Sequence, residues 1–253
     1  MNQKILEVCV DSTASAVAAQ AGGASRLELC SNLVIGGTTP GLALFEEVKR
    51  ETDIPIHVLI RPRFGDFCYD KWEYNVIKRE VELFRDAEAA AVVIGCLTPD
   101  GRLDEERMAE LIDLARPAKV TVHRAFDVCR DAWETLELCG KLGVDTILTS
   151  GQESSSQKGM ALIGKLCRKA SCMEHPVEIM AGAGVNEAVI KQFLKHTEVA
   201  AFHMSGKKIT DSAMVYRKEG VPMGIPGFSE FEIWQTDEDE VRRAVRILFG
   251  SSL

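Results

Sequence analysis

Two short stretches near the start of the chain carry carboxylate and thiol side chains at the same spacing. Glu7 and Cys9 are two residues apart, and so are Glu28 and Cys30. Residues two apart lie on one face of an extended strand, so each stretch presents a carboxylate and a thiol together. We predict that neighbouring strands place the two pairs side by side. Carboxylates can transfer protons and thiolates bind soft metal ions, so both kinds of chemistry are candidates.

The two thiols are candidate metal ligands. Adjacent strands lie about 4.8 Å apart, so the sulfurs of Cys9 and Cys30 could hold one ion between them. Two sulfur ligands suit low-coordinate Cu(I) better than tetrahedral zinc, which would need two more ligands. The alternative is a pair of free thiols packed as small core residues. The other six cysteines show no ligand spacing, and the chain has no CxxC pair.

Polar residues also follow the later strand patterns, where an active site would lie. Glu7, Glu28 and His123 are our candidates for proton transfer. The candidates for holding a small anionic substrate are Arg61, Arg63, Asp127, Ser150, His203 and Ser205. The alternative for the charged residues is an internal layer of salt bridges, and each histidine could equally serve as a hydrogen-bonding structural group.

A regular alternation of strand and helix patterns must position these residues. The eight predicted strands are Lys4–Val10, Ser25–Cys30, Ile56–Arg61, Ala91–Gly95, Val120–His123, Thr146–Thr149, Val177–Met180 and Val199–Met204. A helix pattern follows each of the first seven, and a last helix is expected at about Asp237–Phe249. Eight such units predict a single (β/α)8 TIM-barrel domain over residues 1–253, of the α/β class. Active sites of this fold lie at the carboxyl ends of the strands.

Residues 206–235 depart from the alternation. They contain prolines, several glycines and the aromatic residues Phe228, Phe231 and Trp234. We expect an irregular extension after the eighth strand. A loop of this length is typical of a functional segment or an interface, and the alternative is a surface extension packed on the barrel wall.

Composition excludes some classes of function. The chain has 46% hydrophobic residues and a formal net charge of −8, which argues against non-specific nucleic-acid binding. No apolar run reaches membrane-spanning length, so we expect no membrane partner. The N-terminus leads into a strand without a signal-peptide pattern, which predicts a cytoplasmic protein with free thiols.

Several motifs resemble those of the copper homeostasis protein CutC family. They are Glu7-Val8-Cys9-Val10-Asp11-Ser12, Arg26-Leu27-Glu28-Leu29-Cys30, Gly36-Gly37-Thr38-Thr39-Pro40, Ile60-Arg61-Pro62-Arg63-Phe64, His123-Arg124-Ala125-Phe126-Asp127 and Leu148-Thr149-Ser150-Gly151. The resemblance implies a TIM barrel, a cytoplasmic homodimer or higher homo-oligomer, and a role in copper handling with Cu(I) on Cys9 and Cys30. The alternative function is a TIM-barrel enzyme of unknown reaction, acting on a small anionic molecule at a mouth lined by Glu, Arg and His.

Overall fold

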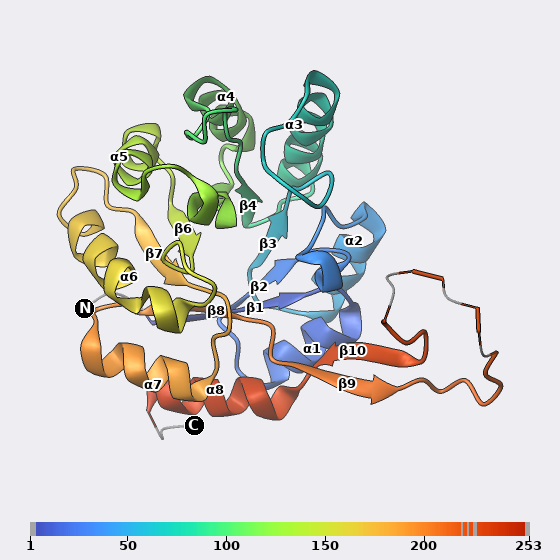
Figure 1. Cartoon of the computed structure of the whole chain (residues 1–253). Coiled ribbons are helices and arrows are strands. Elements are labelled where there is room, and N and C mark those ends of the chain that lie inside the picture. The colour runs from blue at the N-terminus through green and yellow to red at the C-terminus, as the bar shows by residue number, and fades with distance from the viewer. Residues whose placement is uncertain (1–3, 219, 222, 225–226, 251–253) are drawn as a thin grey trace.

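Eight parallel strands close into a barrel, and the helices surround it (Figure 1). The computed structural model describes residues 4–218, 220–221, 223–224 and 227–250. Each strand pairs with the next along the chain, and β8 pairs with β1 to close the ring. The predicted (β/α)8 fold is therefore confirmed.

The strands of the barrel are short, and most are followed by one longer helix. The strands are β1 Ile5–Val10, β2 Arg26–Leu29, β3 Ile56–Leu59, β4 Ala91–Ile94, β5 Lys119–Val122, β6 Thr146–Thr149, β7 Glu178–Ala181 and β8 Ala201–Met204. The α-helices are α1 Thr13–Ala21, α2 Leu42–Glu51, α3 Lys71–Asp86, α4 Glu105–Ala115, α5 Ala132–Leu142, α6 Ser156–Ala170, α7 Glu187–His196 and α8 Glu238–Phe249. Two 3-10 helices, η1 Leu33–Ile35 and η2 Arg124–Val128, follow β2 and β5.

Side chains at the helix starts fix where the strand-to-loop transitions fall. Ser12 accepts a hydrogen bond from the backbone N–H of Ser15 and so begins α1 directly after β1. Asp70 and Glu73 form a capping box at the start of α3. The connection from β1 to α1 is short, so the residues at the end of β1 have defined positions.

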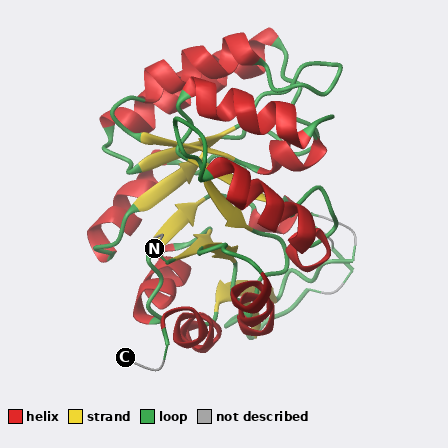
Figure 2. Cartoon of the chain, turned by 90° about the vertical axis from the view of Figure 1, so that its left-hand side faces the viewer, coloured by secondary structure: helices red, strands yellow, loops and turns green. Residues whose placement is uncertain are grey.

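The main apolar core lies between the barrel and its helices. Large side chains such as Leu6, Val8, Phe84 and Phe202 pack there and are fully buried. The interior of the barrel differs, because polar side chains such as Glu7 and His57 lie inside it. Figure 2 shows the strands enclosed by helices, which leaves the two ends of the barrel as the ways into this interior.

The register between β1 and β2 differs from the predicted arrangement. Glu7 lies opposite Arg26, and Cys9 lies opposite Glu28. The predicted side-by-side placement of Cys9 and Cys30 is therefore wrong, since Cys30 follows β2 two residues beyond the partner of Cys9. The cause is the stagger between strands that any closed barrel requires, which spacing within one strand cannot reveal.

The extension after β8 is more regular than predicted. β9 (Lys207–Asp211) and β10 (Glu232–Thr236) pair as an antiparallel hairpin. Figure 1 shows β9 and the segment beyond it reaching away from the barrel. We call the described residues from 207 to 236 the arm. Among the described residues, no helix is both long enough and apolar enough to cross a membrane.

Candidate functional site

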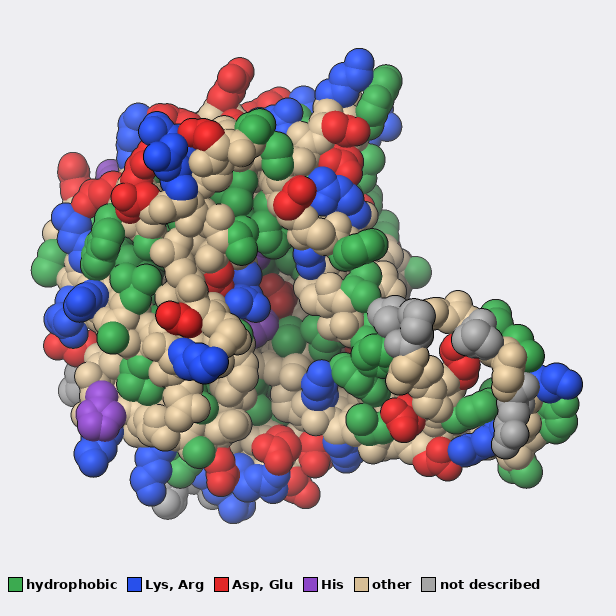
Figure 3. All heavy atoms as spheres, in the orientation of Figure 1, with side chains coloured by type: hydrophobic (Ala, Val, Ile, Leu, Met, Phe, Trp, Pro, Cys, Tyr) green, Lys and Arg blue, Asp and Glu red, His purple; other side chains and the backbone are tan. Residues whose placement is uncertain are grey.

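A cavity of about 620 Å³ opens at the carboxyl ends of the strands. Figure 3 shows it as a hollow near the middle of the face, with charged and histidine side chains inside. Its polar and sulfur-bearing lining residues are Cys9, Glu28, Cys30, Arg61, His123, Arg124, Asp127, His203, Ser205 and Lys207. Eight of the eleven residues predicted from sequence for proton transfer, substrate binding or metal binding are among these lining residues. The other three, Glu7, Arg63 and Ser150, are not.

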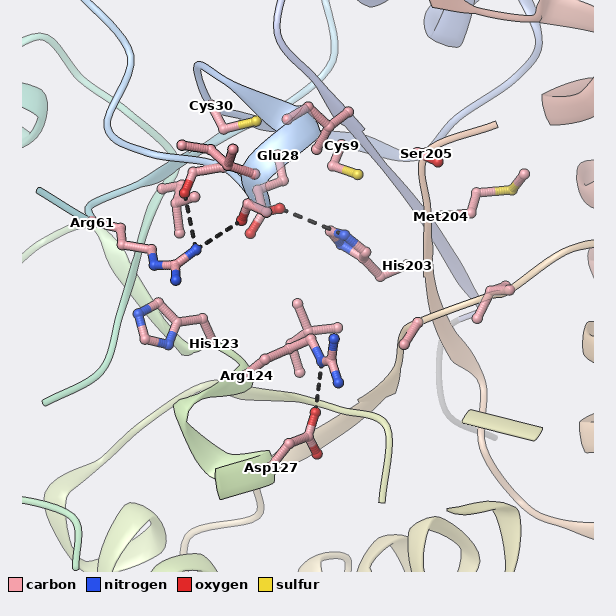
Figure 4. A pocket seen from close by; sticks show the side chains of 18 of the residues that line it. Cys9, Glu28, Cys30, Arg61, His123, Arg124, Asp127, His203, Met204 and Ser205 are labelled. Atoms are coloured by element: carbon pink, nitrogen blue, oxygen red, sulfur yellow. Dashed lines mark hydrogen bonds and ion pairs between the residues drawn. The ribbon is translucent and has the colours of Figure 1, made fainter. Parts of the chain in front are cut away.

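Three potential ligand atoms meet on one side of the cavity. The Cys9 sulfur, a Glu28 carboxylate oxygen and a His203 ring nitrogen all lie within 4.8 Å of one another. They come from β1, β2 and β8, which are neighbours around the barrel, and Figure 4 shows the three side chains grouped together. We call these three residues the ligand group. Its donors are one sulfur, one nitrogen and one oxygen, which can bind a metal ion or move a proton.

Glu7 lies beneath the ligand group and holds it in place. Its carboxylate contacts Arg26 Nε at 2.6 Å, His203 Nδ1 at 2.8 Å and His57 Nδ1 at 3.2 Å. Burial raises the pKa of Glu7, but the hydrogen bonds from His203 and His57 and the charge of Arg26 outweigh it and leave the pKa well below its usual range. Glu7 is therefore ionised and accepts these bonds, which makes it a positioning group.

The bond to Glu7 fixes the orientation of the His203 ring. An ionised carboxylate only accepts, so His203 Nδ1–H is the donor, and Nε2 is left facing Glu28 Oε2 at 3.6 Å. Burial lowers the pKa of His203, yet Cys9, Glu28 and Glu7 together raise it well above its ordinary value. Burial raises the pKa of Glu28 to about 7, with His203 opposing that shift. Glu28 can therefore gain or lose a proton near neutral pH.

A column of alternating charges links the ligand group to the other end of the barrel. Arg26 bridges Glu7 and Glu178, whose carboxylate lies 3.4 Å from the guanidinium and is partly exposed at the amino end of β7. The charged column consists of Glu178, Arg26, Glu7, His203 and Glu28. The predicted layer of carboxylates and arginines exists in this form, with Arg26 as its arginine, whereas Arg61 and Arg63 are paired elsewhere.

Cys30 lies in the cavity wall outside the ligand group. Its thiol contacts the backbone carbonyl of Val10 at 3.6 Å and packs with Leu59 and Val93. Burial, with the nearby Cys9 and Glu28, raises the pKa of the Cys30 thiol far above its usual range. Cys30 is consequently held as a neutral thiol.

Arg61 and His123 form the opposite side of the cavity. Arg61 donates to the carbonyls of Gly36, Gly37 and Gly65, so it ties together two loops of backbone. His123 Nδ1 accepts a hydrogen bond from Ala125 N, and burial followed by the charge of Arg61 lowers the pKa of His123 to about 3. The ring is therefore neutral at physiological pH, with Nδ1 already occupied, which does not favour the predicted role in proton transfer.

A second arginine faces the cavity from η2. Arg124 Nε lies 2.7 Å from an Asp127 carboxylate oxygen, and Arg124 Nη2 donates a hydrogen bond to Ser150 Oγ at 3.0 Å. Asp127 also accepts hydrogen bonds from Thr149 Oγ1 and the backbone N–H of Ser150. Ser150 is fully buried behind this pair and supports it. Arg124 was not among the predicted site residues, although its place directly after the β5 strand end is the signal that could have identified it.

Two other residues complete the comparison with the sequence predictions. Arg63 turns away and pairs with Glu73 at the start of α3 and with Asp66. Ser205 lies at the cavity edge after β8, and Lys207 follows it at the base of the arm. Lys207 was not among the substrate-binding candidates given above, and it begins β9, a strand that the sequence pattern did not indicate.

Comparison with known proteins points to one family. The sequence profile of the CutC family matches residues 4–208. A CutC family protein of Parabacteroides distasonis is 45% identical over 242 residues, covering 95% of this chain and 98% of that protein. The mouse copper homeostasis protein cutC homolog is 40% identical over 242 residues, covering 95% and 88%. The crystal structure of the CutC protein from Streptococcus agalactiae has a TM-score of 0.75 at 28% identity, covering 80% of this chain and 99% of that one.

Proposed function

The chain belongs to the CutC family, and we propose on this basis that it acts in copper homeostasis by binding Cu(I) at the ligand group. The observation that carries the proposal is the meeting of the Cys9, Glu28 and His203 donors within 4.8 Å. Thiolate and imidazole are ligands that suit Cu(I), whereas a carboxylate suits harder ions. Cys9 and His203 are therefore the proposed inner ligands, with Glu28 beside them.

The support beneath His203 favours a metal ligand. Histidine ligands commonly donate their second ring N–H to a carboxylate, which orients the ring and raises its basicity. Glu7 holds His203 Nδ1 in this way at 2.8 Å and leaves Nε2 for an ion. The sequence-based alternative uses Cys9 and Cys30 as the pair. Cys30 would have to give up a proton that its buried surroundings hold strongly.

A competition titration with Cu(I) tests the proposal. We expect Cys9→Ser to weaken the affinity about 100-fold or more and His203→Asn about 10–100-fold, as for other ligand losses and ligand-shell changes. Cys30→Ser should have nearly the same Cu(I) affinity as the unmodified chain. Cys172→Ser is the control, since Cys172 is exposed and lies outside the cavity. An unchanged affinity for Cys9→Ser would refute the site, and an equal loss for Cys9→Ser and Cys30→Ser would favour the two-thiol alternative.

We further propose that the protein is a cytoplasmic homo-oligomer assembled through the arm. Several apolar side chains of the arm are exposed, including Ile209, Met214, Val215 and Met223. Exposed apolar groups gathered on one projection are typical of an interaction surface. All eight cysteines are free thiols, which suits a reducing compartment.

The arm proposal predicts a change of mass in solution. The triple substitution of Met214, Val215 and Tyr216 by serine should convert the oligomer to a monomer, because it removes exposed apolar surface that a partner copy would cover. Sedimentation velocity gives the mass. Val76→Ser on α3 is the control, since Val76 is an exposed apolar residue of the barrel body. An oligomer that survives the triple substitution would contradict the proposal.

A second candidate function is an enzyme acting on a small anionic molecule. Its supporting observation is the size of the cavity, about 620 Å³, which lies in the range of small-molecule sites and far exceeds the needs of one ion. Arg61, Arg124 and Lys207 line it and could attract an anion. A thermal-shift screen with small carboxylates and phosphates tests this candidate, because a ligand of the folded state raises the melting temperature.

A further inference from the structure

Cys9, His203 and Glu7 lie in the order of a nucleophile, a base and an orienting group. Glu7 holds His203 Nδ1 at 2.8 Å, and a ring nitrogen of His203 lies within 4.8 Å of the Cys9 sulfur. This order is the arrangement by which enzymes activate a weak nucleophile, and the separation of nucleophile and base is often loose before substrate binds. Cys9 and His203 both line the cavity, so a bound molecule can reach them.

We propose that the chain is a thiol-dependent acyl hydrolase for small anionic acyl compounds, with Cys9 as the nucleophile. The proposal rests on the second candidate function and names its chemistry. His203 is the general base, and Glu7 is a positioning residue that acts through His203. Metal binding would use only the ligand group. A hydrolase would also use the rest of the cavity, as the space for its substrate.

The reaction balances with water as the co-reactant. The proton that Cys9 and His203 share lies on His203 Nε2, and the thiolate sulfur of Cys9 attacks the carbonyl carbon of the substrate. The bond from that carbon to the leaving group breaks, the leaving group takes the proton from His203, and an S-acyl enzyme remains. Water then loses a proton to His203 and attacks the same carbon. The carbon–sulfur bond breaks, the free acid leaves, and Cys9 and His203 again share one proton.

The lining of the cavity indicates the class of substrate. The guanidinium group of Arg124 is about half exposed in the cavity, with two of its nitrogens held by Asp127 and Ser150. A cation held in this way attracts a carboxylate or phosphate group. Leu33, Leu59 and Leu148 provide an apolar part of the cavity wall, which suits a short acyl chain.

Acetyl phosphate and 4-nitrophenyl acetate are suitable probes, because both deliver the same acetyl group and only acetyl phosphate is charged before it reacts. Peptide mass spectrometry, with a Cu(I) chelator present, should find acetyl on Cys9 in preference to the exposed thiol of Cys172. Phosphate should be released beyond one equivalent, since turnover requires hydrolysis.

His203→Asn should slow acetylation about 100-fold or more. Arg124→Met should slow labelling by acetyl phosphate by a larger factor than labelling by the neutral ester.

Further variants separate a catalytic arrangement from a structural one. Glu7→Gln should lower the maximal acetylation rate and leave the half-saturating acetyl phosphate concentration unchanged. If that variant does not fold, two other results test the proposal. They are the position of the acetyl group in the unmodified chain and the acetylation rate of His203→Asn. Cys172→Ser is the matched control and should behave as the unmodified chain. Acetyl on Cys172 in place of Cys9, an unaltered rate for His203→Asn, or release that stops at one equivalent would overturn the proposal. Intact Cu(I) binding with no acetylation would refute the hydrolase and leave the copper proposal standing.

Discussion

Replacing Glu7 with glutamine is expected to lower the free energy of unfolding by about 3–5 kcal/mol, the cost of removing one partner from a buried charge network. Glu7 is 1% exposed and contacts Arg26, His57 and His203. Without the carboxylate, the charge of Arg26 stays inside the barrel with only the partly exposed Glu178 as a partner. Urea unfolding followed by circular dichroism measures the loss.

Glu178→Gln is the matched control for this prediction. It makes the same chemical change on the other carboxylate that contacts Arg26, but Glu178 lies 3.4 Å away and its side chain is 31% exposed. We expect it to lower the free energy of unfolding by less than about 1 kcal/mol, as for exposed pairs. Equal losses in the two variants would show that Glu7 is not the main partner of Arg26.

Replacing Glu28 with glutamine is expected to stabilise the protein above neutral pH. The folded-state pKa of Glu28 is about 7, against an ordinary value of 4.5, so the folded state keeps a proton that the unfolded state releases between these values. Stability therefore falls as pH rises through this window. The difference of 2.5 pKa units corresponds to a penalty of about 3 kcal/mol above pH 7, at about 1.4 kcal/mol per unit.

Glu28→Gln removes this penalty because glutamine carries no charge at any pH. The variant should be up to about 3 kcal/mol more stable than the unmodified chain at pH 8 and nearly equal to it at pH 4. The depressed pKa of Glu7 acts in the opposite direction, since its contribution is lost as pH falls, but both chains contain it and their difference isolates Glu28. A difference that stays constant from pH 4 to pH 8 would contradict the assignment.

The barrel could be predicted because its signals are local. Alternating apolar positions mark the strands, and side chains such as Ser12 and Asp131 mark the helix starts. The predicted strand Thr146–Thr149 agrees with β6 residue for residue. These signals depend only on residues that are close together in the sequence, so one sequence is enough to recognise them.

The candidate site was predictable only in part, because its contacts depend on stagger and on side-chain direction. Cys9 and Cys30 have matching sequence spacings, yet Cys9 lies opposite Glu28. Arg63 was expected to face the cavity, but the acidic cap of α3 offers it Glu73 as a partner. Arg26 was not among the predicted site residues, and it proves to be the central cation of the charged column. None of these side-chain contacts can be predicted from the local sequence pattern of one strand.

The charged column also determines which alignment of the strands is acceptable. Shifting β2 by two residues along β1 would keep every side chain on its face, so an apolar interior could tolerate the error. Here the same shift would place Glu28 opposite Glu7 in place of Arg26, and two carboxylates would face each other away from water. We therefore expect the charged side chains inside the barrel to favour one register of β2 against β1 over the others. This effect does not depend on any molecule that the cavity binds.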